Sequence, residues 1–453
     1  MFRKLSLVPL ILSGFVLFAM AGVCFAGTSA KLEQSKSKII SLIEKNNFAE
    51  AQLQTQKLIA DFSGRPDLPE TLYLITERYE WSSRFEEAKS IYQQIIQKYP
   101  NSSDESKSKL YISKADVMSL IMSQDYKGAE EAFNKLVSDF AEHPELPETI
   151  YWIAEKYGWE LKFDQAKQIY QQIIQKYPDS PWADKAKIGA AKAGVLSLIY
   201  MKNYNQAEDA LNKMVSDFSE HPDLPETLYW VAERYGWSLK FEDAKRVYQQ
   251  IIREHPKSSW ANRAKLGISK ADVLSLIVSG DYDRAEAALN KMVADFSGHP
   301  DLPEAIIIVG DRYDIEGIWK GKAGLAEQSE TNFKRAAEVW SKGANGLPDS
   351  DLAPQAYCRA GDCYLKLGKY EESLRCFQKV ADNYPGYEYA WHALHMVGRN
   401  IEGLKESGVL SESEANPRAE AAYRKILEKY PDCPAAEHAS RWLSHKVGVE
   451  KEK

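Results

Sequence analysis

Apolar residues recur along this chain with the spacing of helix faces. In the segment 225–256, one stripe at i, i+3, i+4 and i+7 contains Leu228, Val231, Ala232 and Tyr235. After a short polar turn, a second stripe contains Ala244, Tyr248 and Ile251. Residues at these spacings lie on one face of an α-helix, so the segment predicts two helices packed as a hairpin. Pro256 ends the second helix.

The pattern repeats every 78 residues. The Asp-Leu-Pro-Glu motif of residues 67–70 returns at 145–148, with Glu in place of Asp, and at 223–226. It returns in weaker form from Asp301, and the same step separates Trp81, Trp159 and Trp237. A period of this length indicates stacked units that bury their apolar faces against neighbours, so we predict an array and not one globule.

Each unit contains two hairpins of unequal length. An aromatic residue follows every predicted turn, at Phe48, Phe85, Tyr126, Phe163, Tyr204, Phe241 and Tyr282. The steps between these residues alternate between 37 and 41. The duplicated unit is therefore the pair of hairpins.

The Asp-Leu-Pro-Glu motif has the composition of a helix start. Asp223 is expected to cap the first helix with its side chain, and Glu226 to reach back as in a capping box. Pro225 is tolerated in the first turn, where amide donors lack intrahelical partners.

The segment 357–385 carries a family resemblance. Its characteristic residues are Tyr357, Gly361, Tyr364, Gly368, Tyr370, Phe377 and Pro385. In this order they resemble the tetratricopeptide repeat, with Ser373 where that family usually has Ala. The resemblance covers nearly all of 31–446. It implies an all-α fold, an α-solenoid of about ten helical hairpins in a right-handed superhelix, and it names no partner because the family binds many unrelated ones.

The junctions between hairpins share a second motif. Residues 177–183 read Tyr-Pro-Asp-Ser-Pro-Trp-Ala, and related versions start at Tyr99, His255, Tyr384 and Tyr430. These junctions resemble those of bacterial periplasmic repeat proteins, such as the outer-membrane assembly lipoprotein and the cell-division coordinator of the Tol-Pal system. The resemblance implies a compartment, the cell envelope, and no specific role.

The array loosens after Pro303. We predict a regular array over 27–301, a diverged array over 302–446 and a charged tail over 447–453. Two stretches, 314–332 and 400–416, read as insertions, and either a second site or solvated loops would fit their glycines and charges. A last helix over about 435–446 is expected to cap the exposed apolar end of the stack.

The first 26 residues have the composition of a signal peptide. Arg3 and Lys4 precede an apolar stretch over 5–23, and small residues suit cleavage after Ala26. A retained anchor and a lipid-modified Cys24 are the alternatives. No later apolar run is long enough to span a bilayer. We therefore expect an exported chain that is periplasmic or associated with the outer membrane.

Charge and cysteine content narrow the function classes. The 453 residues include 65 acidic and 58 basic side chains, a net charge of −7, which argues against a nucleic-acid binder. The cysteines beyond the signal are Cys358, Cys363, Cys376 and Cys433. We favour buried free thiols, because Cys358 and Cys363 lie on different helix faces, although an exported chain permits disulfides.

No sequence motif indicates catalysis. The chain lacks the nucleophile-elbow, zinc-protease, dinucleotide-binding and phosphate-loop patterns. His143, His221 and His299 are one unit apart, which is too far for a shared metal, and each lies in a turn before a Pro. We therefore expect surface turn residues, no metal site, no cofactor and no enzyme activity.

The candidate binding surface is a stripe on the first helix of each unit. In the resembled family this stripe lines the concave groove, and here it would contain Tyr73, Glu77, Trp81, Tyr151, Glu155, Trp159, Tyr229, Glu233 and Trp237. Aromatic anchors would suit a protein or peptide partner, and the carboxylates would favour a basic one. The alternative is that these aromatics pack between hairpins, as we expect of Trp152 and Trp230. A glycan binder, including peptidoglycan, and a passive spacer are the other functions that fit.

Overall fold

The computed structural model describes residues 29–346, 348 and 352–450, which form helices and turns without a strand among them. They group into two compact units, one ending at Leu146 and one beginning at Pro147. The predicted signal peptide, residues 1–26, lies outside the described residues. The predicted array boundary at 301 stays a prediction.

The helices of the first unit begin with one over residues 29–44. Those that follow are α2 (Phe48–Asp61), α3 (Leu68–Trp81), α4 (Phe85–Lys98), α5 (Ser103–Met122) and α6 (Tyr126–Asp139). From the unit boundary onward come α7 (Leu146–Trp159), α8 (Phe163–Lys176), α9 (Pro181–Tyr200), α10 (Tyr204–Asp217), α11 (Leu224–Trp237), α12 (Phe241–Glu254), α13 (Ser259–Ser279) and α14 (Tyr282–Asp295). The remaining helices are α15 (Leu302–Lys322), α16 (Ala326–Gly346), α17 (Ala353–Lys366), α18 (Tyr370–Asn383), α19 (Ala390–Glu406), α20 (Glu412–Lys429) and α21 (Ala436–Glu450).

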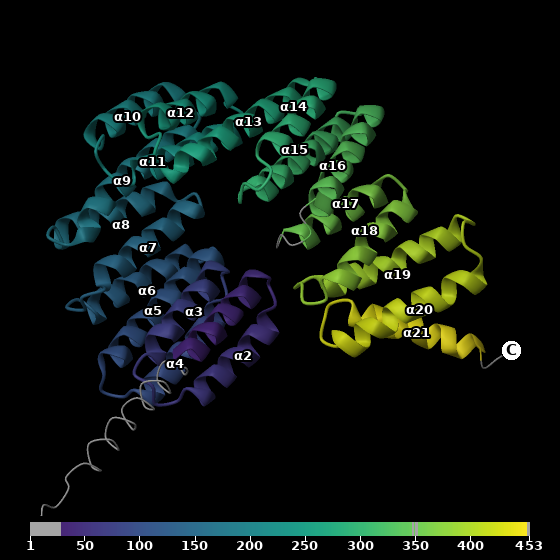
Figure 1. Cartoon of the computed structure of the whole chain (residues 1–453), viewed down its shortest axis with the longest axis horizontal. Coiled ribbons are helices and arrows are strands. Elements are labelled where there is room, and N and C mark those ends of the chain that lie inside the picture. The colour runs from purple at the N-terminus through teal and green to yellow at the C-terminus, as the bar shows by residue number, and fades with distance from the viewer. Residues whose placement is uncertain (1–28, 347, 349–351, 451–453) are drawn as a thin grey trace, which may run out of the picture. The chain divides into compact units, whose positions relative to one another are not determined.

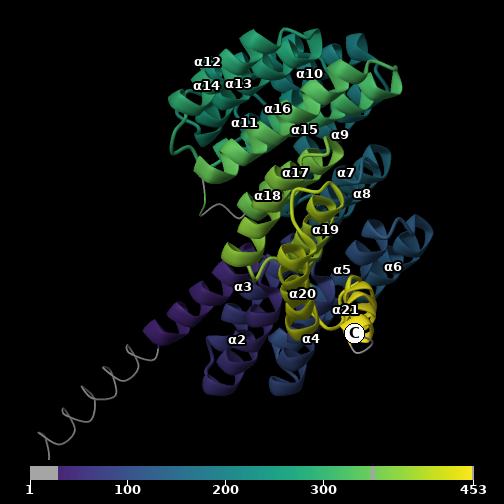
Figure 2. The ribbon, with the colours of Figure 1, turned by 90° about the vertical axis from the view of Figure 1, so that its right-hand side faces the viewer.

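The described helices pair into ten hairpins followed by α21, which confirms the predicted all-α solenoid (Figure 1). Many consecutive helices within a unit pack side by side, as α15 and α16 do in both Figure 1 and Figure 2. The predicted right-handed superhelix stays a prediction.

Helix length explains the alternating steps of 37 and 41. Each predicted turn aromatic begins the second helix of its hairpin, as Phe163 begins α8 and Tyr204 begins α10. The first helices differ in length, with 14 residues in α11 and 20 in α9. The longer first helix accounts for the longer step.

Helix starts use different caps from those predicted. The side chain of Asp223 accepts no capping hydrogen bond at the start of α11, so the predicted cap is wrong. Instead, Nδ1 of His221 accepts a hydrogen bond from the Asp223 amide at 3.1 Å. At the Tyr-Pro junctions the serine is the cap, since Ser180 accepts from the Trp182 amide at 3.3 Å.

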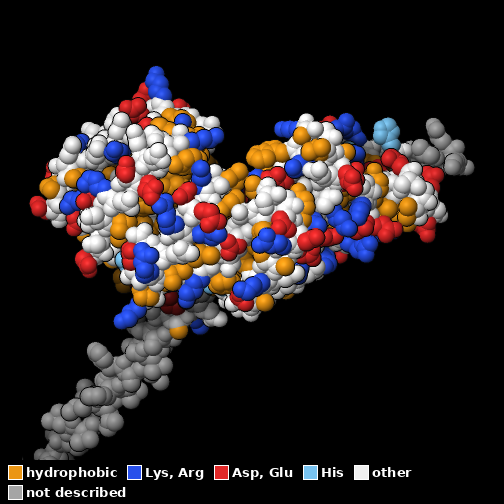
Figure 3. Space-filling view, turned by 90° about the horizontal axis from the view of Figure 1, so that it is seen from above, with side chains coloured by type: hydrophobic (Ala, Val, Ile, Leu, Met, Phe, Trp, Pro, Cys, Tyr) orange, Lys and Arg blue, Asp and Glu red, His pale blue; other side chains and the backbone are white. Residues whose placement is uncertain are grey.

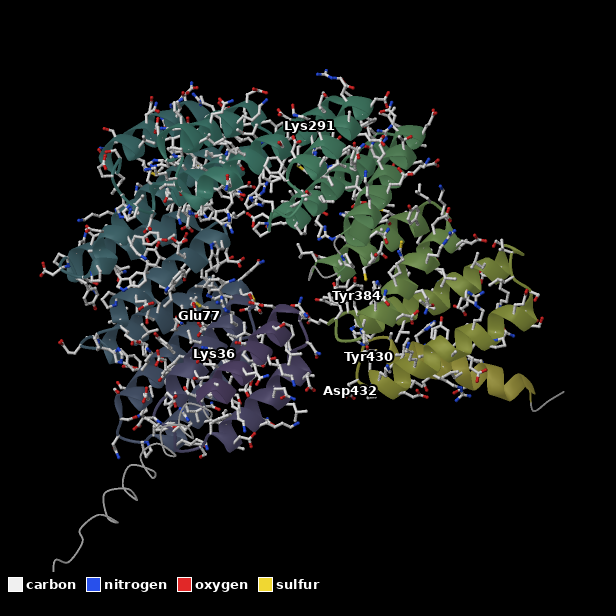
Figure 4. All side chains as sticks on the ribbon, viewed as in Figure 1. Lys36, Glu77, Lys291, Tyr384, Tyr430 and Asp432 are labelled. Carbon is white, nitrogen blue, oxygen red and sulfur yellow. The ribbon has the colours of Figure 1, made fainter. Side chains whose placement is uncertain are left out.

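The tyrosines of these junctions join neighbouring hairpins. The hydroxyl of Tyr384 donates to the carbonyl of Pro348 at 2.8 Å, and that of Tyr430 donates to the carbonyl of Pro385 at 2.7 Å. Both tyrosines follow the second helix of a hairpin (Figure 4). The motif thus stabilises the stack by linking one junction to the previous one.

The two predicted insertions are helical extensions. Residues 314–332 lengthen α15 and α16 to 21 residues each, and the turn between them contains Gly324 at φ +77°. Residues 400–416 complete α19 and begin α20. Reading either stretch mainly as a solvated loop is therefore wrong. A helix, α21, lies where the cap helix was predicted and extends past 446 into the predicted tail, and its capping role stays a prediction.

Four cysteines lie in the described part of the chain, and all are free thiols. Cys358, Cys363 and Cys376 are buried and Cys433 is half-buried, as we favoured. Burial raises the pKa of Cys358 to about 12, so its thiol is protonated at neutral pH. Among the described residues, no helix combines the length and hydropathy that crossing a bilayer requires.

Candidate functional site

The tryptophans of the predicted stripe are exposed. Trp81, Trp159 and Trp237 are 61%, 61% and 59% exposed, and each is the last residue of its helix. Exposed aromatic side chains mark a contact surface where they form a contiguous patch. The structure therefore leaves these three side chains available to a partner.

The tyrosines of the stripe behave differently. Tyr151 and Tyr229 are half-buried, and their rings lie 5.1 Å from those of Trp182 and Trp260 on the next long helix. In the first unit, the Tyr73 hydroxyl donates to the Asp104 carbonyl at 2.9 Å. These tyrosines pack between hairpins, which was the alternative interpretation of the stripe.

The stripe glutamates of the second unit are neutralised by buried ion pairs. Glu155 lies 2.8 Å from the ammonium of Lys192, and Glu233 lies 2.7 Å from that of Lys270. Burial alone would raise the pKa of Glu155, but the charge of Lys192 and hydrogen bonds from Lys192 and Tyr170 lower it. Since the two carboxylates are already paired, they give no reason to expect a basic partner.

The first unit forms the same arrangement from another helix position. Glu80, and not the predicted Glu77, lies 2.7 Å from the ammonium of Lys114, and it accepts a hydrogen bond from the Tyr92 hydroxyl at 3.0 Å. Glu77 is half-buried on the same helix (Figure 4). In the second unit, Gly158 and Gly236 occupy the position of Glu80, and space is open above both.

A hollow of about 270 Å³ opens beside Gly158 in the second unit. It is lined by Glu155, Gly158, Trp159, Leu161, Phe163, Ala166, Tyr170, Lys192, Ala193, Leu196, Trp230, Arg234 and Trp237. The hollow thus brings together one glutamate and two tryptophans of the predicted stripe. It is concave, largely aromatic and contains a few polar groups, which is typical of binding sites.

Trp230 lines this hollow and is 42% exposed. The expectation that it packs between hairpins is therefore wrong, whereas Trp152 is half-buried and lies 6.4 Å from Trp182. The two residues occupy the same position of the repeat, so sequence could not separate them. Their different environments come from the neighbouring helices.

Arg234 is the cation of the hollow. It is 9% exposed, and its guanidinium carbon lies 5.0 Å from the ring centroid of Tyr200 and 5.8 Å from that of Trp237. Burial lowers the pKa of Arg234. Its Nε has no hydrogen-bond partner. Aromatic faces stabilise the charge in part, and no acidic side chain among the described residues pairs with it.

Sequence analysis missed Arg234, Trp230 and the buried partners of the glutamates. A usable signal existed in the alignment of the copies, where Lys192 and Lys270 recur 37 residues after Glu155 and Glu233. That spacing is one hairpin, so the lysine lies on the next first helix. The opposite charges of these positions could have indicated pairing.

The histidines behave as predicted turn residues. Nδ1 of His143 and His299 accepts the amide hydrogen of Glu145 and Asp301, at 3.2 and 3.1 Å, as His221 does for Asp223. Within the described ranges, no group of three potential metal ligands comes together. These side chains therefore shape turns.

The face shown in Figure 3 mixes basic and acidic side chains without a broad region of one sign. This distribution accords with the small net charge of −7. Recognition in the hollow must therefore come from local contacts, since the surface supplies little long-range steering.

Comparison with known proteins identifies four repeats. The tetratricopeptide repeat models match residues 70–102, 148–180 and 226–258, and a second model of that repeat matches 354–387. The first three matches recur with the 78-residue period, and the third and the fourth cover most of α11–α12 and α17–α18. No curated protein sequence matches the chain significantly.

Several solved structures align with the chain at low similarity. A tetratricopeptide repeat protein from Parabacteroides merdae is 15% identical, with 63% of this chain and 98% of that chain covered and a TM-score of 0.32. A monomeric IFIT1 mutant with Gppp-AAAA is 13% identical, with 93% and 92% covered and a TM-score of 0.31. The four matched segments show that this chain contains tetratricopeptide repeats, and the other described helices pair into hairpins as well.

Proposed function

We propose that this chain is an exported, non-enzymatic scaffold of the cell envelope that binds a segment of a partner protein in the hollow beside α7 and α11. The observation that carries the proposal is the convergence of Trp159, Trp230 and Trp237 on one concave surface. Clustered tryptophans around a pocket are typical anchors of protein interfaces, where a few residues supply most of the binding free energy.

Two features favour a protein segment over a glycan or a passive spacer. A spacer has no need for exposed tryptophans, because exposed apolar patches promote aggregation unless a partner covers them. The tyrosines that would have extended the aromatic surface into a long sugar-binding ladder are half-buried against Trp182 and Trp260. What remains exposed is a compact pocket suited to side chains.

Export and envelope association rest on the N-terminal residues and the junction motif. Basic residues followed by an apolar stretch and a small-residue cleavage site are typical of signal peptides. The Tyr-Pro junctions resemble those of periplasmic repeat proteins of the Tol-Pal and outer-membrane assembly types. Both features support a role outside the inner membrane.

The test is a double substitution, Trp159→Ala with Trp237→Ala, followed by pull-down from envelope extract and mass spectrometry. A partner that the unaltered chain captures is then purified, and its affinity for both chains is measured. Loss of two anchors should weaken binding at least 30-fold, about 2 kcal/mol.

A matched control is Trp319→Ala on α15. Trp319 is 52% exposed and lies under Arg312, outside the hollow. Binding should be unchanged in this variant. Equal binding by the double variant, with its helical content intact, would exclude the hollow as the site. Retention of the unaltered chain on purified peptidoglycan, lost in the double variant, would favour the glycan alternative.

A further inference from the structure

One position of the repeat has a basic side chain in each copy of the second unit, but its ion-pair partner differs between copies. At this position, Lys156 lies 3.1 Å from the carboxylate of Glu160, four residues later. Arg312 is likewise paired with Glu316, again four residues later. The corresponding residue after Arg234 is Ser238. In the part of the chain that the structure describes, Arg234 has no acidic partner.

An unpaired and buried guanidinium is unfavourable in the free protein. Removing one member of a buried ion pair destabilises proteins because the remaining charge is left without compensation. The rings of Phe163, Tyr200 and Trp237 compensate only in part, from 5.7, 5.0 and 5.8 Å. A ligand that brings a carboxylate to Arg234 would supply the negative charge that Glu160 and Glu316 provide in the neighbouring copies.

We propose that the hollow binds an acidic side chain, Asp or Glu, within an extended segment of the partner protein. Arg234 forms the ion pair, and a neighbouring apolar side chain of the same segment lies among the tryptophans. This inference rests on the proposed function and specifies the chemistry of its ligand.

Charge complementarity excludes the opposite assignment. Lys192 and Glu155 neutralise each other at 2.8 Å, so the net charge of the hollow comes from Arg234. A basic side chain would meet this guanidinium and be repelled. A neutral side chain would leave it unpaired, whereas a carboxylate matches its planar donors in a bidentate geometry.

The placement of the aromatics favours an internal residue of the segment over a chain end. Along α11, Trp230 lies one turn before Arg234, and Trp237 lies one turn after it. A segment that contacts both tryptophans continues in both directions from the ion pair. The acidic residue is therefore expected to have further residues on each side.

The test uses two arrays of nonapeptides with acetylated and amidated ends. Each peptide in the first array has a central Glu followed by an aromatic or aliphatic residue, and the second array has Gln in place of that Glu. Peptides bound by the full chain are remeasured by fluorescence anisotropy. We expect the central Glu to strengthen binding at least tenfold over Gln.

Two variants test Arg234 in different ways. Arg234→Gln removes the cation, and Ser238→Glu keeps it but supplies the partner that Lys156 has in Glu160. Each variant should abolish the preference for Glu over Gln. Arg312→Gln, at a position already paired, should retain the preference.

Several results would overturn the inference. These are equal affinity for Glu and Gln peptides, a preference that persists in Ser238→Glu, and binding that requires a free C-terminal carboxylate. Displacement of the peptide by an oligogalacturonate, with no preference for Glu peptides, would indicate an acidic glycan. If the tryptophan variants lose the partner while Glu and Gln peptides bind alike, the proposed function stands and only this inference fails.

Discussion

The helices α9 and α13 occupy the same place in successive copies of the repeat, and α9 borders two hollows. The first is the 270 Å³ hollow that contains Arg234. The second, of about 510 Å³, lies on another face of α9 and is lined by Ala190 and Gly194. On α13 the corresponding residues are the larger Ile268 and Asp272. The α9 residues at these positions are thus smaller than those of α13 and border the second hollow.

The buried contacts of the two helices are nevertheless the same. Lys192 and Lys270 each pair with a glutamate, and Gly189 and Gly267 each lie against a tyrosine ring. A Cβ at Gly267 would approach the ring of Tyr248 to 2.6 Å, so only glycine fits there. Duplication has kept the contacts that hold the stack, while half-exposed positions have changed.

The largest effect is expected from breaking the shared ion pairs. Lys192→Ala and Lys270→Ala each leave a buried glutamate without its cation, which should lower the free energy of unfolding by about 3–5 kcal/mol. Urea unfolding measures the change. As a control, Lys213→Ala removes the exposed ion pair with Asp217. This variant should change the free energy of unfolding by less than about 0.5 kcal/mol.

Lys192 and Lys270 also differ in solvent exposure, which provides a second test of the difference between α9 and α13. The Lys192 side chain is 16% exposed and that of Lys270 is 10% exposed. If water in the Arg234 hollow hydrates the α9 pair, Lys192→Ala will be the milder substitution. If Lys192→Ala lowers the free energy of unfolding more than Lys270→Ala does, water in the hollow does not stabilise the unpaired Glu155.

The last layer of the stack forms a comparable cluster without a lysine. Glu402 accepts hydrogen bonds from the Tyr423 hydroxyl, at 3.0 Å, and from the indole nitrogen of Trp442. The rings of His395 and His438 lie beside Tyr423, 4.8 Å from each other. Burial, His438, Arg399 and His392 lower the pKa of His395 to about 4.

This cluster predicts a dependence of stability on pH that begins at higher pH than that of Glu155, whose pKa is lowered from 4.5. Because the unfolded pKa is near 6.5 and the folded pKa is lower, the unfolded chain binds more protons between pH 6.5 and 4. Stability is therefore complete above pH 6.5 and falls as the pH drops. After allowance for solvent screening, the loss is roughly 1–2 kcal/mol.

Thermal unfolding as a function of pH tests this prediction. His395→Phe should remove that share of the acid sensitivity and leave the rest, which comes from other groups. Equal slopes for both chains between pH 6.5 and 4 would contradict the lowered pKa of His395.

The smallest effect is expected from making α9 resemble α13. Lys245 lies 2.9 Å from Asp272, whereas Lys167, at the same place of the previous copy, faces Gly194. Gly194→Asp restores the pair and removes a helical glycine. Stability should rise by about 0.5–1 kcal/mol, measured by urea unfolding. A decrease would mean that the glycine has a packing role.

The sequence predicted correctly those features whose physical cause lies within a few residues along the chain. The starts of the second helices followed from Phe163, Tyr204 and their equivalents, since each aromatic lies beside its own turn. The capping box predicted at Asp223 assigned the Asp223 amide to Glu226, whereas His221, two residues earlier, accepts that amide hydrogen. At the site, the exposed Trp159 and Trp237 were predicted, and the hollow that joins them was not.

The sequence by itself determined the period, the ten hairpins and the all-α solenoid, because helical periodicity and turn residues act over a few positions. Only the tertiary structure decided which stripe residues face outward. Burial depends on helices one hairpin away, so Glu155 is neutralised by Lys192 and the Tyr151 ring packs against Trp182. For the same reason Arg234 became the unpaired cation of the hollow: its environment comes from Phe163 and Tyr200, which the 78-residue period does not reveal.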